Sequence, residues 1–205
     1  MISQVRAKIA KALRQRLGFP DQESALRRLC DNGFSPKLIL DVGASYGLFV
    51  DEASAFWPNA EIHCFEPEPE YIARLEERAK REPRVHVCGA LVGSATNASV
   101  EYHFHLGASS VLATNDAASK GGHQILPLRQ ADMVSLSDYC AAKGLSPDLL
   151  KIDVQGYELE VLKGANAILP RIEVVLTEVN HIEIYRGAPL AGELIQYMCS
   201  HGLAR

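Results

Sequence analysis

Residues 38–47, LILDVGASYG, place an aspartate and two glycines directly after three apolar residues. The apolar run predicts a buried strand and the following LFVDEASAFW predicts a helix, so Gly43 and Gly47 lie in the bend between them. Glycines let a backbone approach a ligand closely. Asp41 repels a phosphate and favours a ligand that carries positive charge. S-adenosylmethionine has this character, because it carries a sulfonium and an ammonium group and no phosphate.

A second carboxylate, Glu66, ends the next predicted strand, about 20 residues beyond the loop, where an acid can accept hydrogen bonds from both ribose hydroxyls of a nucleotide. This position suits NAD as well as S-adenosylmethionine. The dinucleotide fingerprint needs GxGxxG, which GASYG lacks, so a nicotinamide-dependent oxidoreductase is the less favoured alternative. Glu66 can also be a simple negative charge at a helix start, since it precedes Pro67.

Three further polar residues end later predicted strands: Asp153 in KIDVQG, and Glu178 and His181 in TEVNH. If a methyl group is transferred to a hydroxyl, a base must lie beside the cofactor. Asp153 or Glu178 can bind the cofactor amine or the acceptor, and His181 can accept a proton near neutral pH. In the alternative interpretation Asp153 caps the helix near Tyr157 and His181 lies on a solvated loop. A magnesium site formed by these acids is a minor alternative.

The elements that must position these residues alternate between strand and helix patterns, which predicts a parallel α/β sheet. The predicted strands are residues 37–44, 61–67, 84–93, 148–156 and 173–180. Apolar residues at helical spacing predict helices over 68–82 and 157–169.

One stretch departs from this rhythm. SVEYHFHL, residues 99–106, alternates apolar and polar residues and predicts a half-exposed strand, as in a hairpin. His103 and His105 share its polar face, where solvation is favoured over metal binding because no third ligand is near. Residues 107–130 are predicted to form a long loop of the kind that is functional or disordered.

The chain of 205 residues is long enough for one substantial domain. A net charge of −4 gives no general attraction to nucleic acid, and no apolar run is long enough to span a bilayer. Five scattered cysteines without a CxxC pair indicate reduced thiols and no metal site, so a cytoplasmic location is expected. Residues 2–18 predict a basic amphipathic helix, for which packing on its own domain or a second subunit is more common than membrane contact.

Four stretches in this order resemble the FkbM family of S-adenosylmethionine-dependent methyltransferases: ILDVGASYG, CFEPEPE, GASSVL and LLKIDVQGYELEVLKGA. The resemblance runs from about Ser35 to Tyr197. It implies a Rossmann-like class I methyltransferase with a mostly parallel, doubly wound sheet, S-adenosylmethionine as the cofactor, and O-methylation of a small molecule or glycan. The expected organisation is an N-terminal helical segment at 1–34 followed by a methyltransferase domain at 35–205.

The catalytic residues expected from this interpretation are Asp153, Glu178 and His181. The expected cofactor-binding residues are Asp41, Gly43, Ala44, Ser45, Gly47, Glu66, Pro67, Ala90, Ser110 and Asp153. Ser109 and Ser110 align with a paired-serine motif of the family.

Two departures from the family pattern keep a catalytically inactive, methyltransferase-like binding module open as a third interpretation. Ser45 stands where the family usually has asparagine. The sequence also ends before the antiparallel strand pair that normally completes such a sheet, and the sheet edge left exposed would favour a homo-oligomer.

Overall fold

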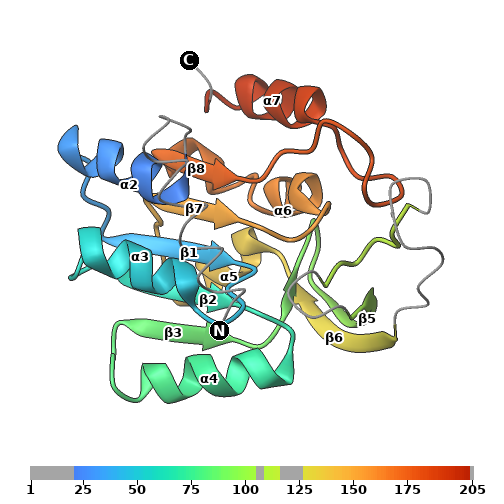
Figure 1. Ribbon diagram of the computed structural model, residues 1–205, viewed down its shortest axis with the longest axis horizontal. Helices are drawn as coiled ribbons and strands as arrows, with labels where there is room; N and C mark the ends of the chain where they lie inside the picture. Colours follow the sequence, from blue (N-terminus) through green and yellow to red (C-terminus); the bar gives the residue numbers. More distant parts are fainter. Residues whose placement is uncertain (1–20, 105–108, 116–126, 204–205) are drawn as a thin grey trace, which may run out of the picture.

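The computed structural model describes residues 21–104, 109–115 and 127–203, and its main sheet has five parallel strands in the order β3–β2–β1–β7–β8. Figure 1 shows them side by side, from β3 at the bottom to β8 at the top. The strands are β1 (Leu38–Val42), β2 (Glu61–Phe65), β3 (Val85–Cys88), β7 (Leu149–Ile152) and β8 (Val174–Thr177). The predicted parallel α/β sheet is confirmed, although each strand is shorter than expected.

Helices cover both faces of this sheet, so its central strands β2, β1 and β7 are almost completely buried. One core lies between the sheet and α2 (Gln22–Asp31), α3 (Leu48–Phe56) and α4 (Pro69–Ala79). The other lies between the sheet and α5 (Leu136–Lys143), α6 (Glu158–Gly164), η1 (Leu169–Arg171) and α7 (Ala191–Ser200). Side chains alternate between these cores, so Ile39 packs toward α3 and Leu40 toward α6.

A smaller sheet follows β3 and consists of β4 (Leu91–Val92), β5 (Asn97–His103) and β6 (Leu128–Val134). Strands β5 and β6 pair antiparallel, which confirms the predicted half-exposed strand. Two expectations were wrong in part. The predicted strand at 84–93 is divided between the two sheets, and the predicted loop at 107–130 ends earlier, because β6 begins at Leu128.

Helix α2 packs residues of the predicted N-terminal segment against the core. Leu26 is fully buried in the core that α2 shares with α3. The predicted amphipathic helix at residues 2–18 lies outside the described residues, as does His105. No helix in the described ranges is long and apolar enough to cross a membrane. After β8, the described residues contain no antiparallel strand pair.

The loops after β1 and β7 touch at Gly43. Its φ of 76° is in the left-handed region, and Asp153 donates a backbone hydrogen bond of 3.0 Å to the carbonyl of Val42. A Cβ at Gly43 would overlap the carbonyl oxygen of Asp153. Only glycine therefore lets these two loops approach so closely.

Gly43→Ala is expected to lower the free energy of unfolding by about 3 kcal/mol or more, because it adds overpacking to the penalty of a positive φ. Gly144→Ala is the matched control: φ is 66° there, but an added Cβ meets no atom within 4 Å. It should lose only about 1 to 2 kcal/mol. Urea unfolding of both variants measures the difference, and equal losses would contradict the steric argument.

Candidate active site

A pocket of about 700 Å³, counted with its open mouth, lies at the carboxyl ends of the central strands. This is the edge of a doubly wound sheet where ligands bind. The loop after β1 contributes Gly43 and Ser45, the chain after β2 contributes Glu66, and the loop after β7 contributes Asp153 and Gln155. Residues 109–111 close one side.

Most of the predicted cofactor-binding residues line this pocket, although their role stays a prediction. Those that line it are Gly43, Ser45, Glu66, Pro67, Ala90, Ser110 and Asp153. Asp41, Ala44 and Gly47 do not line it. Gly47 instead precedes α3 in a left-handed conformation with φ of 82°, and the side chain of Ala44 is buried in the core beneath that helix.

Glu66 is held in place by two backbone groups. Its Oε2 accepts a hydrogen bond of 2.8 Å from the N–H of Ser45, and its Oε1 accepts one of 3.0 Å from the N–H of Glu68. Desolvation raises the pKa of Glu66 to about 7, although these two bonds oppose the shift. Glu66 is therefore a fixed carboxylate that changes charge near neutral pH.

Asp41 lies beneath the pocket. Its side chain is completely buried, and the Nζ of Lys151 on β7 lies 2.9 Å from its Oδ1. The same ammonium donates a hydrogen bond of 2.7 Å to the carbonyl of Gly43. Burial raises the pKa of Asp41, and the charge of Lys151 opposes this. In this structure Asp41 shapes the loop after β1 through Lys151, whereas the sequence predicts that Asp41 faces a cofactor.

Gln155 connects Asp153, which lines the pocket, with Glu178, which does not. Its Nε2 donates to Asp153 Oδ1 at 2.8 Å and to Glu178 Oε2 at 3.3 Å, while its Oε1 accepts from the hydroxyl of Tyr185 at 2.9 Å. Its backbone φ of 57° is left-handed, which is unusual for a residue with a side chain. The amide thus holds two carboxylates from neighbouring strands in one cluster.

The two predicted carboxylates therefore come together, whereas the predicted histidine does not join them. Desolvation and the nearby charges of Asp153 and Glu158 raise the pKa of Glu178. His181 is exposed in the segment after β8 and does not line the pocket. Its proposed catalytic role stays a prediction without support from the geometry.

Ser109 and Ser110 hold the segment 109–115 beside the pocket through side-chain hydrogen bonds. Ser110, which is 4% exposed, donates a hydrogen bond of 2.7 Å to the carbonyl of Gln155. Ser109 donates to Glu68 at 3.2 Å. Farther along, Thr114 forms a β-bridge with Tyr185. Both serines thus act in this structure by positioning the chain that closes the pocket.

Sequence reasoning missed Lys151, Gln155 and Tyr185. A buried ion pair of Lys151 could have been predicted from the sequence, because a lysine inside an otherwise apolar strand needs a buried partner. Glu68 was also missed. It is 1% exposed, pairs with Arg129 of β6, and so links the end of β2 to the smaller sheet.

The chain is similar to known methyltransferases in sequence. The methyltransferase FkbM domain family matches residues 41–203. The chain is 31% identical to the 31-O-demethyl-FK506 methyltransferase FkbM of Streptomyces tacrolimicus, with 80% of this chain and 72% of that protein covered. It is 24% identical to the hexuronic acid methyltransferase AglP of Haloferax volcanii, with 78% of this chain covered. It is 27% identical to the 2-O-methyltransferase NoeI of Sinorhizobium fredii, with 73% covered.

The chain spans 62% of the length of AglP and 66% of that of NoeI. Its fold is similar to the crystal structure of a methyltransferase FkbM from Methylobacillus flagellatus, with a TM-score of 0.54 at 18% identity. That similarity covers 81% of this chain and 37% of the other. Because the family match extends from Asp41 in β1 to the residues after α7, the protein belongs to the methyltransferase FkbM domain family.

Proposed function

We propose that the protein is an S-adenosylmethionine-dependent methyltransferase that methylates a hydroxyl oxygen of a small molecule or glycan. The charge of the pocket carries this proposal. Two carboxylates, Glu66 and Asp153, line it, and no lysine or arginine is among the described residues that do. Such a pocket repels a pyrophosphate and favours a cationic cofactor.

The residues present fit this cofactor. Each oxygen of Glu66 accepts one backbone hydrogen bond and keeps a lone pair for a ribose hydroxyl. Apolar surface from Phe65, Ala90 and Leu91 lines the same pocket and suits an adenine ring. Asp153 lies at the end of β7, where a carboxylate can bind an ammonium group.

Methyl transfer to a hydroxyl requires that the acceptor oxygen be positioned and that its proton be accepted. The cofactor supplies an electrophilic methyl group, so the protein has to hold the acceptor oxygen in line with it. Gln155 joins Glu178, whose pKa is raised, to Asp153 in the wall of the pocket. We propose that this pair accepts the proton of the acceptor hydroxyl.

The names of the relatives support the acceptor class. NoeI is named for a 2-O-methylation and FkbM for 31-O-demethyl-FK506, so both names specify an oxygen, and AglP is named for a hexuronic acid. We also propose a cytoplasmic location, which the five free cysteines support. Homo-oligomer formation and peripheral membrane contact stay predictions.

The alternatives differ from this proposal in measurable ways. A nicotinamide-dependent oxidoreductase is disfavoured by the acidic pocket and by membership of a methyltransferase family. An inactive binding module would share the cofactor pocket and lack turnover.

S-adenosylhomocysteine should bind the folded chain with one site in calorimetric titration. NADH should not bind, because the two carboxylates among the described lining residues repel its pyrophosphate. Release of S-adenosylhomocysteine from S-adenosylmethionine, in the presence of a panel of hydroxylated sugars, then tests turnover. If S-adenosylhomocysteine does not bind protein that circular dichroism shows to be folded, the proposal is contradicted.

Glu66→Ala is expected to weaken S-adenosylhomocysteine binding by about a hundredfold or more, because two hydrogen bonds to a charged acceptor are lost at about 1.5 to 3 kcal/mol each. Thermal stability should change little, since losing two backbone bonds is offset by removing a desolvated carboxylate. Glu70→Ala is the matched control, an exposed acid in the first turn of α4. If Glu66 were only a helix-start charge, both variants would bind alike.

The ribose itself can be tested with two ligands. The wild-type protein should bind adenosine more tightly than 2′,3′-dideoxyadenosine, whereas Glu66→Ala should bind both equally weakly. A preference that survives in Glu66→Ala would place the ribose elsewhere.

Cofactor affinity should rise with pH through neutrality. The unliganded carboxyl of Glu66 has a pKa of about 7, and its ionised form is the better acceptor for two hydroxyl groups. At pH 6 most of the protein must release a proton on binding, so affinity for S-adenosylhomocysteine should be about tenfold weaker than at pH 8. Glu66→Gln should remove this component, and calorimetry at both pH values in both proteins measures it. A slope that is identical in the two proteins would contradict the assignment.

A further inference from the structure

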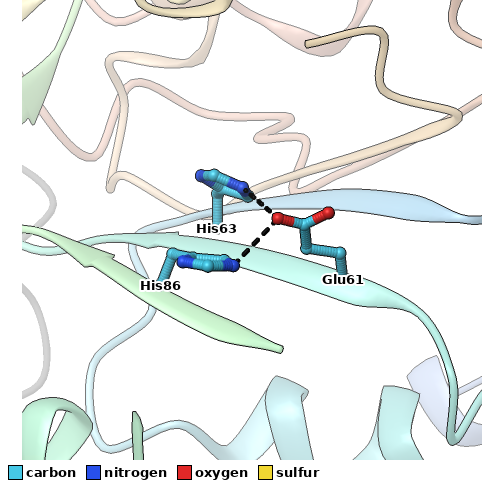
Figure 2. A group of neighbouring side chains, drawn as sticks. All are labelled: Glu61, His63 and His86. Atoms are coloured by element: carbon cyan, nitrogen blue, oxygen red, sulfur yellow. Dashed lines mark hydrogen bonds and ion pairs between the residues drawn. The ribbon is translucent and has the colours of Figure 1, made fainter. Parts of the chain in front are cut away.

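Away from the pocket, Glu61, His63 and His86 gather on one face of the main sheet. His63 on β2 lies directly opposite His86 on β3 in the parallel register. Glu61 shares the face of His63 because side chains two residues apart in a strand point the same way. Figure 2 shows both imidazole rings directed at one carboxylate oxygen of Glu61. None of the three residues lines the pocket.

The spacing of the three ligand atoms matches a metal coordination sphere. Oε1 of Glu61 lies 3.3 Å from Nε2 of His63 and 2.8 Å from Nε2 of His86. One ligand atom from each residue lies within 4.8 Å of the others. In a tetrahedral site with bonds of about 2.1 Å, neighbouring ligand atoms lie about 3.4 Å apart. The separation of 3.3 Å is close to this value, and binding of an ion requires the separation of 2.8 Å between Glu61 and His86 to lengthen.

His63 is already fixed in a ligating orientation. It is 4% exposed and stacks on His86 with ring centroids 4.5 Å apart. Its Nδ1 lies 2.8 Å from the hydroxyl of Tyr139 on α5. When Nδ1–H donates to that hydroxyl, the lone pair of Nε2 faces Glu61. Metal-ligating histidines commonly have such a partner on the other ring nitrogen, which holds the ring and sets its tautomer.

The cluster is open to solvent on one side. The side chains of His86 and Glu61 are 42% and 45% exposed, whereas that of His63 is 5% exposed. An ion can therefore enter from solvent, and water can complete its coordination.

We propose that Glu61, His63 and His86 form a binding site for a divalent transition metal, with zinc as the expected occupant. Two imidazoles and one carboxylate suit zinc and its neighbours in the series, whereas magnesium prefers oxygen ligands alone. The ion would tie β3, at the edge of the main sheet, to β2. The proposal departs from the expectation from sequence that the chain has no metal site.

The competing explanation is a hydrogen-bonded cluster without metal. In that case both Nε2–H groups donate to Glu61, and the hydroxyl of Tyr139 donates to Nδ1 of His63. The two explanations differ in histidine tautomer and in the ability to bind a stoichiometric ion.

Zinc titration of the full chain, stripped with a chelator and free of any affinity tag, tests the site by calorimetry. We expect one ion per chain, a raised melting temperature with zinc and neither effect with magnesium. His86→Ala should weaken zinc binding more than tenfold and abolish the thermal shift, because it removes a direct ligand. Its exposed side chain makes this variant compatible with folding, which circular dichroism verifies, and Glu61→Gln provides a second variant on the other exposed ligand.

His103→Ala is the matched control, a histidine on β5 outside the cluster, and it should bind zinc like the wild type. Cobalt provides the spectroscopic check, because ligation by the cluster gives no thiolate-to-metal absorption band. The proposal is overturned if zinc does not bind stoichiometrically, if His103→Ala and not His86→Ala abolishes binding, or if cobalt shows thiolate ligation.

Discussion

The buried pair of Asp41 and Lys151 is the interaction on which the pocket depends. Both residues lie in adjacent central strands and point toward α3, where the ammonium lies 5.8 Å from the ring centroid of Phe49. Two charges are expensive to bury, and removing one partner from such a pair typically destabilises a protein by about 3 to 5 kcal/mol. The ammonium of Lys151 also donates to the carbonyls of Val42 and Gly43, so it fixes the backbone at the turn where β1 ends.

The remaining contacts of the site continue outward from this turn. Beyond Gly43, the N–H of Ser45 points at Glu66 and thereby joins the ends of β1 and β2. The close approach of Gly43 to Asp153 joins the ends of β1 and β7. Gln155 then connects Asp153 with Glu178, and the carbonyl of Gln155 receives the hydroxyl of Ser110. A continuous set of polar contacts therefore leads from a buried ion pair to the segment that covers the pocket.

Local patterns in the sequence were sufficient to predict the strand, glycine bend and helix at residues 38–56 and the acid at the end of β2. They could not predict contacts that arise from strand register. Asp41 is an example: it alternates with Leu40 and Val42, so the strand directs it toward α3 and away from the pocket. Lys151 completes this pair from a neighbouring strand far along the chain.

Other features were hidden for different physical reasons. Strand β6 is only partly buried, and its sequence LRQADMV lacks the apolar pattern that marks a strand. The role of Gln155 depends on a left-handed backbone conformation that non-glycine residues seldom adopt. His63 and His86 become neighbours only through the pairing of β2 with β3. In each case the decisive information is tertiary, whereas the sequence patterns report local structure.

The contacts that form the pocket join residues at very different separations along the chain. The contact between Ser45 and Glu66 spans 21 residues, whereas Lys151 reaches the carbonyl of Gly43 across 108. The entropy of closing a loop grows only with the logarithm of its length, so the longer closure is disfavoured by only about 1 to 2 kcal/mol more. Long-range parallel pairings are nevertheless slow to form. During synthesis on the ribosome, the half of the site that contains Ser45 and Glu66 emerges well before Lys151, which pairs with Asp41. The pocket can therefore be completed only after β7 has been translated and inserted beside β1.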